Sequence, residues 1–541
     1  MPKLRKPGVV FQPDTSQGLY RGVHQIVDAI RPTLGPNARV VAVESTSRDK
    51  SPELLDCGGL IARRVIQIND RDADVGAMYL RQVLWEIYDE MGDATATAAV
   101  LFGSIYDQGL RLVSAGANPM LLQSAFEKGL RVILEELDRM AIPIETQQQL
   151  TRIAQSVCYD QPLAEVMGEI FDLISAYGSL RIQGGRGREP VKEFVQGTYW
   201  DQGLASKEML LNIPRQRSDL QDAHVLISDL VLEDQQELIP FLDMAHRNGV
   251  HSLLMIAAKF SDPVLGLLNS LPQRADHFRV LAVKTPGLAQ TDQIAHLEDL
   301  AVLTGGRPVV KATSESLAGV ALEDLGQARR VWADMEFFGV IYGKGDPRQV
   351  RQQIVKLTAA FRNASEKEPR ERAQERVGRL TGGSATIFVG GSTDSEIKFR
   401  KDLAGRTAQV IRAGLREGAL PGGGSALLAC IPALQKLLER ASEQEEAMAY
   451  RILIRALQEP LRAISENAGL SPSEVMIALD QAGPQYGFDV QKQKVVLLGE
   501  MVLDVTAALK AAVHGAISGS ALLLTTDAIV HKKKPPLTFN P

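Results

Sequence analysis

The stretch from Glu90 to Leu101, EMGDATATAAVL, combines residue types that can bind a phosphate group. A glycine and an aspartate stand directly before a run of small and hydroxylated residues, and a long apolar helix pattern follows. Phosphate binding needs closely approachable backbone N–H groups, hydroxyl donors, and a carboxylate for Mg2+. The alternative is that Asp93 only caps the helix N-terminus, which stabilises a helix by about 1 kcal/mol. Spacing alone leaves both interpretations open.

The composition argues against several other kinds of chemistry. The chain has 541 residues, of which 45% are hydrophobic and 23% charged, as in an ordinary soluble protein. That length corresponds to about three domains. The formal net charge of −5 offers no basic surface for nucleic acid. Three widely separated cysteines, Cys57, Cys158 and Cys430, disfavour both a disulfide framework and a zinc site.

We expect neither a signal peptide nor a membrane-spanning segment in this sequence. The N-terminus, MPKLRKPGVVFQPD, is basic but lacks the apolar core of a signal peptide. No stretch reaches the roughly 18 uncharged apolar residues of a membrane span. The short basic tail, HKKKPPLTFNP, is expected to be solvated. We therefore expect a cytoplasmic protein with neither nucleic acid nor a membrane as partner.

Helices must position the phosphate-binding stretch. The pattern over residues 72–92 predicts a helix whose apolar face comprises Val75, Met78, Tyr79, Val83 and Ile87. A second helix is predicted from residue 95 to Gly116, which would be its C-cap. Asn118 and Pro119 then have the residue types of an N-cap and a first helical position.

The middle of the chain has a different pattern. Apolar runs of strand length at residues 223–230, 251–258 and 278–286 are separated by helical segments such as residues 234–249. This alternation predicts an α/β domain with buried, parallel strands. Long helices return after Ala408. The middle therefore reads as an inserted domain, with the two termini folding together.

Several segments stand out along the chain: RGVHQIVDAIRPTLGPNARVV, GDATATA, AVKTPG, LAVLTGG, LEDLGQARRV, EGALPGGGSALL and YGFD. In their order and spacing these segments resemble group I, GroEL-type chaperonins of the TCP-1/cpn family. The most specific single piece is Leu322–Ala328.

The resemblance implies an α+β multidomain chaperonin fold. A mainly helical equatorial domain would comprise residues 1–139 and 417–541, a hinge-like intermediate domain residues 140–196 and 383–416, and an inserted α/β apical domain residues 197–382. It further implies a homo-oligomeric, heptameric ring that binds non-native polypeptides, uses ATP and Mg2+, and has a lid co-chaperonin as a further partner.

The resemblance also assigns a nucleotide site. Asp93 matches the family's Mg2+ ligand, while Ala94 and Ala96 replace a glycine and a threonine of the family's pattern. Gly423 and Asp489 would lie near the base, and Asp504 would bind the ribose. The matched cofactor-binding positions are Thr33, Leu34, Gly35, Pro36, Asp93, Ala94, Thr95, Ala96, Thr97, Gly423, Asp489 and Asp504.

The catalytic positions depart from the family. Its two catalytic aspartates fall on Cys57 and Arg406. A thiol with a reference pKa of about 8.5 is mostly protonated, and an arginine cannot act as a base. Two nearby carboxylates are alternative catalytic groups, Asp56 beside Cys57 and Asp402 one helical turn before Arg406. We expect ATP binding with slow or absent hydrolysis.

Apolar residues of the middle domain match the family's client-binding positions. Those on two helices cover more than one helical face, which favours an exposed apolar groove over a core-facing stripe. The matched residues are Leu204, Met209, Ile239, Leu242, Leu267 and Leu268.

Two functions remain open from the sequence. The first is a chaperonin that assists folding or refolding with ATP. The second is a hydrolysis-deficient ring that acts as a holdase or scaffold. Asp93, Asp504 and the apolar helices of the middle domain favour the first function, while Cys57 and Arg406 favour the second.

Overall fold

A computed structural model divides the chain into two compact units. Unit 1 comprises residues 1–172, 186–189 and 390–541, and unit 2 comprises residues 173–185 and 190–389. The described residues are 8–37, 39–44, 52–185, 187–210, 217–271, 278–287, 289–313, 316–364, 366–381 and 383–532. The basic tail from residue 533 and the predicted domain boundary at residue 382 lie outside them. The division into three domains stays a prediction.

Unit 1 is mainly helical. Its helices are α1 (Asp14–Ile30), α2 (Gly58–Arg64), α3 (Arg71–Met91), α4 (Thr95–Ser114), α5 (Pro119–Met140), α6 (Gln147–Cys158), α7 (Gln161–Ile174, which ends just inside unit 2), α13 (Asp394–Glu417), α14 (Ser425–Ala429), α15 (Ile431–Arg440), α16 (Gln444–Ala456), α17 (Glu459–Asn467), α18 (Pro472–Ala482) and α19 (Thr506–Leu524). The predicted N-cap of the third helix is confirmed, because the Asn118 side chain accepts the Met120 N–H. The C-cap of α4 is Ala115 rather than the predicted Gly116, which follows it with a φ of 102°.

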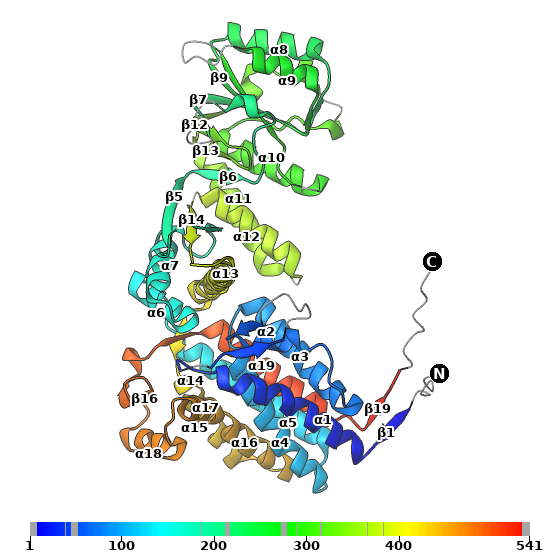
Figure 1. The fold of residues 1–541 in the computed structure, drawn as a ribbon, viewed down its shortest axis with the longest axis vertical. Coiled ribbons are helices and arrows are strands. Elements are labelled where there is room, and N and C mark those ends of the chain that lie inside the picture. Colours follow the sequence, from blue (N-terminus) through cyan, green and yellow to red (C-terminus); the bar gives the residue numbers. More distant parts are fainter. Residues whose placement is uncertain are drawn as a thin grey trace. The chain divides into compact units, whose positions relative to one another are not determined.

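The centre of unit 1 is built from both ends of the chain. Helix α19 packs against α3, α4 and α5 (Figure 1). By length and composition α19 is apolar enough to cross a membrane, but 67% of its apolar window is buried inside the protein. It therefore serves as a core helix here.

Helices α1 and α3 pack backbone to backbone. A Cβ atom on Gly22 would lie 1.8 Å from the Ala73 carbonyl oxygen, and one on Gly76 would lie 2.4 Å from that of Leu19. The buried face of α3 accordingly includes Ala73, Gly76, Ala77, Leu80, Leu84 and Ile87. Of the predicted face only Ile87 is buried: Val75 is 39% exposed, and Met78, Tyr79 and Val83 are partly buried, because the close approach selects small residues for the contact.

Short strands complete unit 1. Strand β1 (Val9–Phe11) pairs antiparallel with β19 (Ala528–Val530), so the two ends of the described chain lie side by side (Figure 1). Three further antiparallel pairs are β2 (Val41–Val43) with β3 (Glu53–Leu55), β15 (Ala419–Pro421) with β18 (Leu503–Val505), and β16 (Tyr486–Asp489) with β17 (Lys494–Leu497).

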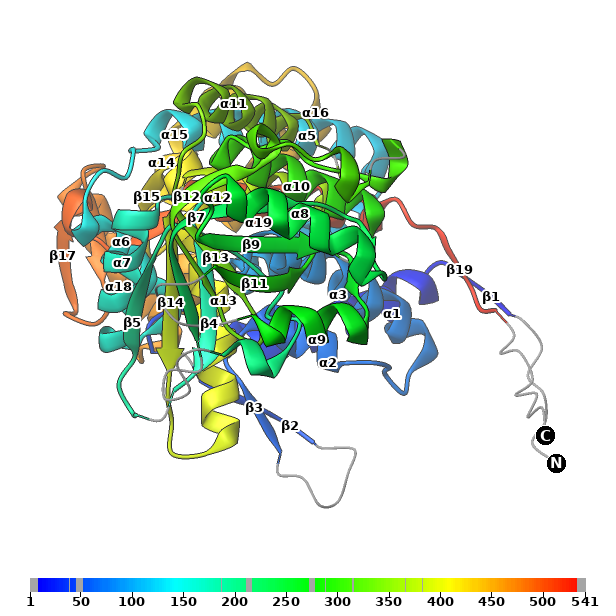
Figure 2. The ribbon, with the colours of Figure 1, turned by 90° about the horizontal axis from the view of Figure 1, so that it is seen from above.

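Unit 2 contains a six-stranded sheet in the order β11-β9-β7-β12-β13-β6. Strands β7 (Ser218–Ile227), β9 (Ser252–Ala257) and β11 (Arg279–Lys284) are parallel, which confirms the prediction, and Figure 2 shows β9 and β11 side by side. Strands β12 (Gly326–Ala333), β13 (Phe338–Gly343) and β6 (Thr198–Trp200) add antiparallel pairs. All six residues of β9 are buried, as expected for a strand covered on both faces.

Helices and smaller sheets surround these strands. The helices of unit 2 are α8 (Gln235–Arg247), α9 (Asp262–Ser270), α10 (Gln290–Thr304), α11 (Pro347–Asn363) and α12 (Lys367–Thr381). Strand β14 (Gly383–Val389) pairs with β4 (Ser179–Gly184) and β5 (Val191–Gln196), and β8 (Val231–Leu232) pairs with β10 (Lys259–Phe260).

Candidate functional site

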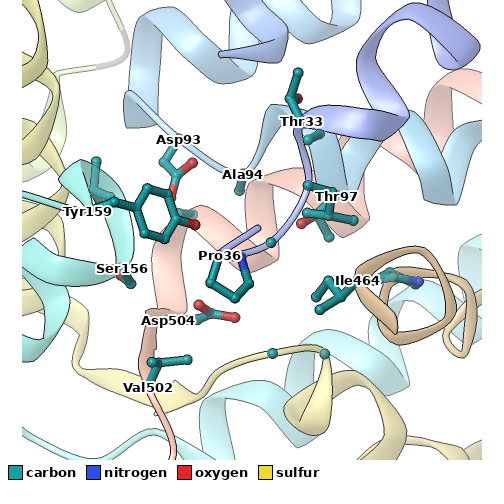
Figure 3. A pocket seen from close by; sticks show the side chains of 18 of the residues that line it. Thr33, Pro36, Asp93, Ala94, Thr97, Ser156, Tyr159, Ile464, Val502 and Asp504 are labelled. Atoms are coloured by element: carbon teal, nitrogen blue, oxygen red, sulfur yellow. The ribbon is translucent and has the colours of Figure 1, made fainter. Parts of the chain in front are cut away.

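A cavity of about 540 Å3 lies within unit 1 and is lined by segments far apart in the sequence. Its volume is within the range of ligand pockets, about 300–1,000 Å3. Figure 3 shows Pro36, Asp93, Tyr159 and Asp504 around this space. Every predicted cofactor-binding residue lines it, namely Thr33, Leu34, Gly35, Pro36, Asp93, Ala94, Thr95, Ala96, Thr97, Gly423, Asp489 and Asp504.

The N-terminus of α4 faces the cavity without a side-chain cap. The N-cap residue is Ala94, in the left-handed conformation (φ 64°, ψ 9°), and its side chain makes no capping hydrogen bond. The alternative interpretation, in which Asp93 caps the helix, is therefore wrong. The first-turn N–H groups have no intrahelical partner, and they carry the positive end of the helix dipole. This arrangement suits an anion.

The two threonines of this turn have different surroundings. Thr95 is buried, and its Oγ1 accepts the Gly59 N–H at 3.0 Å, which joins α4 to the start of α2. Thr97 is partly exposed and lines the cavity. Thr97 is therefore the more available hydroxyl donor for a phosphate.

The Thr33–Pro36 loop is fixed in place from α17. The Asn467 amide donates to the carbonyl oxygens of Arg31 (2.9 Å) and Leu34 (2.8 Å). Gly35 has a φ of 94°, in the left-handed region that favours glycine, and a Cβ there would lie 3.2 Å from Ile464. This loop follows α1, so the first helix of the chain holds one wall of the cavity.

Two carboxylates share the cavity. Burial, with a smaller contribution from Asp93, raises the pKa of Asp504 to about 7. Burial also raises the pKa of Asp93, against the opposing effects of the Ala94 N–H group and the Arg406 guanidinium. Both side chains remain partly accessible, because they face the cavity. A bound cation would stabilise their charged forms.

The carboxylates fit Mg2+ only as part of a shared site. The described residues contain no group of three or more His, Cys, Asp and Glu that could hold a metal alone. Magnesium commonly binds through one or two carboxylates together with phosphate oxygens and water. Asp93 fits that role because it lies beside the uncapped helix N-terminus.

The predicted catalytic region contains an ion pair. Arg406, from α13, is buried, and its Nη2 lies 3.2 Å from Asp56 Oδ1. Cys57 is also buried; burial raises the pKa of its thiol, against the opposing charge of Arg406. Both Cys57 and Arg406 line the cavity, together with Asp56. The carboxylate of Asp56 is thus present but bound to a cation.

The remaining predicted residues differ in availability. Asp402 is exposed and does not line the cavity, although it is one turn from Arg406 on α13. Asp489 lines it, but its Oδ1 accepts the Gln491 and Lys492 N–H groups, each at 3.0 Å. Burial, which would raise the pKa of Asp489, is outweighed by its contacts with Lys492, which lower it. Asp489 therefore shapes the turn after β16.

Sequence reasoning missed many residues of the site, and two of them shape the cavity in a way that can be described. Tyr159, the C-cap of α6, has a φ of 49° and projects its ring beside Asp93 (Figure 3). Asn467 holds the Thr33–Pro36 loop from a distant helix. Neither residue belongs to a motif with a fixed spacing, and only the tertiary structure brings them to the site.

The predicted client-binding residues do not form one exposed groove. Ile239 on α8 is 46% exposed, and Leu267 on α9 is partly buried. The other four are core residues of unit 2, which corrects the prediction of their exposure: Leu204, Met209, Leu242 and Leu268.

The physical reason is that these side chains complete the packing around the six-stranded sheet. Leu242 lies on the buried face of α8 with Leu238 and Phe241. Met209 Sδ accepts the Ala282 N–H of β11 at 3.4 Å. Apolar residues on more than one face of a helix were therefore not a sign of exposure in this domain.

The chain was compared with known proteins. The model of the TCP-1/cpn60 chaperonin family matches residues 26–242 and 275–534. Among solved structures, the chaperonin gp146 from the bacteriophage EL 2 (Pseudomonas aeruginosa), crystallised in the presence of ATP-BeFx, matches with a TM-score of 0.70. The identity is 18%, and the match covers 97% of this chain and 99% of that chain. The predicted chaperonin fold is confirmed. Because the family match runs from α1 to the last strand and includes both walls of the cavity, this chain belongs to the TCP-1/cpn60 chaperonin family.

Proposed function

We propose that this protein is a chaperonin-like ring protein that binds ATP with Mg2+ in the unit 1 cavity and binds non-native polypeptides through unit 2. The observation that carries the proposal is the uncapped α4 N-terminus, which shares one cavity with Asp93 and Asp504. The N–H groups and the Thr97 hydroxyl would hold phosphate oxygens, Asp93 would hold Mg2+, and Asp504 would bind the ribose. Bound Mg2+ would neutralise phosphate charge.

The ion pair favours slow or absent hydrolysis. Hydrolysis needs a carboxylate that orients or deprotonates a water molecule. Asp56 is the carboxylate beside Cys57, and its charge is engaged by Arg406. This pairing supports the second candidate, a ring that holds or scaffolds polypeptides without a productive ATPase cycle. A heptameric ring, a lid co-chaperonin and a cytoplasmic location belong to the proposal through the family resemblance.

Nucleotide binding and turnover are to be measured separately on the purified chain. We expect calorimetry to detect ATP binding that Asp93→Asn weakens, because the Mg2+ ligand is lost. The rate of phosphate release by the wild type should be close to that of the Asp93→Asn variant. Steady turnover that disappears in Asp56→Ala would instead show that Asp56 acts as the base, and would reject the scaffold function. The assembly size in the same samples, measured by mass photometry, tests the ring.

The polypeptide-binding part has its own assay. Suppression of aggregation of a chemically denatured protein should occur at stoichiometric amounts of this chain, with or without ATP. Failure to suppress aggregation would contradict client binding while leaving the nucleotide site untouched. Recovery of the client's activity only on adding ATP would favour a folding chaperonin over a holdase.

A further inference from the structure

Arg406 is a cation placed inside the nucleotide cavity. Its side chain projects from the middle of α13 and lines the same space as the α4 N-terminus. Its backbone packs closely against the loop that leads to α4, because its carbonyl oxygen lies 3.3 Å from where a Cβ on Gly92 would be. The guanidinium is therefore held near the start of α4 by the backbone contact of two elements.

The hydrogen bonds of this guanidinium are incomplete. One nitrogen, Nη2, contacts both oxygens of Asp56, at 3.2 and 3.5 Å. These distances exceed the roughly 2.7–2.9 Å of a strong charge-assisted bond, and the contact is not a two-nitrogen fork. Within the described part of the chain, Nε is buried with no hydrogen-bond partner. Buried donors are nearly always satisfied, so the protein leaves part of the hydrogen-bonding capacity of this guanidinium unused.

The position of Arg406 within the cavity distinguishes one end from the other. The Arg406 carbonyl oxygen packs against Gly92, directly before Asp93. The Asp504 carboxylate instead lies beside Gly422, where a Cβ would be 2.9 Å from Asp504 Oδ1. Arg406 therefore lies at the Asp93 end, where the α4 N–H groups also converge. A nucleotide with its ribose at Asp504 would direct its terminal phosphate toward this end.

We propose that Arg406 is a specificity-determining ligand of the terminal phosphate and makes the cavity select nucleoside triphosphates over diphosphates. A phosphate offers the guanidinium two oxygens in a fork, which is better than the single-nitrogen contact with Asp56. Asp56 holds the guanidinium when no terminal phosphate is bound and releases it when a nucleoside triphosphate binds. This inference rests on the proposed nucleotide site, and it adds a preference for three phosphates over two.

The test is calorimetric binding of the Mg2+ complexes of ADP and of a non-hydrolysable ATP analogue to the full chain. The wild type should prefer the triphosphate by about tenfold or more. Arg406→Gln should remove most of that preference and change ADP affinity little, because a diphosphate does not reach residue 406. Arg406→Lys, which keeps the charge but lacks the fork, should retain part of it.

Matched variants separate phosphate recognition from folding. Asp56→Asn removes the competing carboxylate and should tighten triphosphate binding only. The double variant Asp56→Asn, Arg406→Gln keeps a neutral hydrogen-bonding pair, so it should fold as the wild type does and bind like Arg406→Gln. The inference is overturned if Arg406→Gln weakens both nucleotides equally or leaves the preference unchanged. If the wild type binds neither nucleotide, the proposed function itself has failed.

Discussion

Ala94 is held in a backbone conformation that suits glycine. Its φ of 64° places an L-residue in the left-handed region, which costs about 1–2 kcal/mol. Replacement by glycine removes that cost but gives the unfolded chain more freedom, an opposing effect of about 0.4–1 kcal/mol. Ala94→Gly should therefore raise the free energy of unfolding by about 0.5–1 kcal/mol, measured from urea unfolding midpoints.

The control for this prediction is a second alanine in the same helix. Ala98 is fully buried in the interior of α4, where glycine costs about 1 kcal/mol or more. Ala98→Gly should lower the free energy of unfolding. If both variants destabilise the protein equally, the left-handed conformation at Ala94 is not strained.

Asp504 should make stability depend on pH. Its pKa is raised to about 7 from an unfolded value of about 3.9, so the folded state binds more protons between those values. This group then leaves stability unaffected below pH 4. Stability falls as the pH rises from 4 to 7, and above pH 7 the charged Asp504 destabilises the fold to its full extent. Asp504→Asn should raise the unfolding midpoint at pH 8 and leave it almost unchanged at pH 4.

Asp489 provides a comparison of opposite sign. Its pKa is lowered by Lys492, despite the opposing effect of burial, so its charged form stabilises the fold above about pH 4. That contribution is lost as pH falls through the lowered pKa. Asp489→Asn should therefore lower the unfolding midpoint at pH 8 and have less effect at acid pH. Equal responses of the two variants at pH 8 would contradict the assignment of the Asp504 pKa.

At the scale of residues, positions matched by motif in separate segments share one cavity, but the sequence left many of the lining residues and much of the chemistry unidentified. Asp93, Asp504 and Gly35 all line this cavity, because the spacings of their motifs accompany fixed local structure. The Arg406–Asp56 ion pair joins positions that lie 350 residues apart, and no local pattern records such a contact. The same holds for the Asn467 amide that fixes the Thr33–Pro36 loop.

At the scale of elements, helix positions were predictable and buried faces were not always so. Caps such as Asn118 act through neighbouring residues and leave a local signal. The α1–α3 contact depends on Gly22 and Gly76, which a count of large apolar residues ignores. In unit 2 the same counting led to an exposed groove, although Leu242 and Leu268 complete the core.

Helix α8 offers a matched pair that separates client binding from packing. Ile239 is 46% exposed, while Leu242, one turn away, is 7% exposed. Ile239→Ser should change the free energy of unfolding by no more than about 0.5 kcal/mol and weaken the suppression of client aggregation. Leu242→Ser should destabilise unit 2 by about 2–5 kcal/mol. Unaltered aggregation suppression by Ile239→Ser would remove α8 from the client surface.

At the scale of the whole molecule, unit 2 contains what an independent domain needs. Its main apolar cluster comes from residues between Trp200 and Val340. Fully buried Asp299 on α10 receives two hydrogen bonds from Arg376 on α12, at Oδ1 and Oδ2, each 2.8 Å long. Burial raises the pKa of Asp299 against the effect of Arg376. Helix α12 therefore supplies the positive charge that pairs with the buried Asp299.

The predicted apical range, residues 197–382, should accordingly fold alone, with a cooperative thermal transition in circular dichroism. A fragment that ends at Gly343 keeps the sheet but lacks α11 and α12, so Asp299 would be buried without Arg376. Removing one partner of a buried ion pair costs about 3–5 kcal/mol, so the shorter fragment should melt at a much lower temperature. Arg376→Met in the longer fragment should reproduce most of that loss, while Arg372→Met, which removes an exposed guanidinium, should not. Equal melting of both fragments would show that the core does not depend on α12.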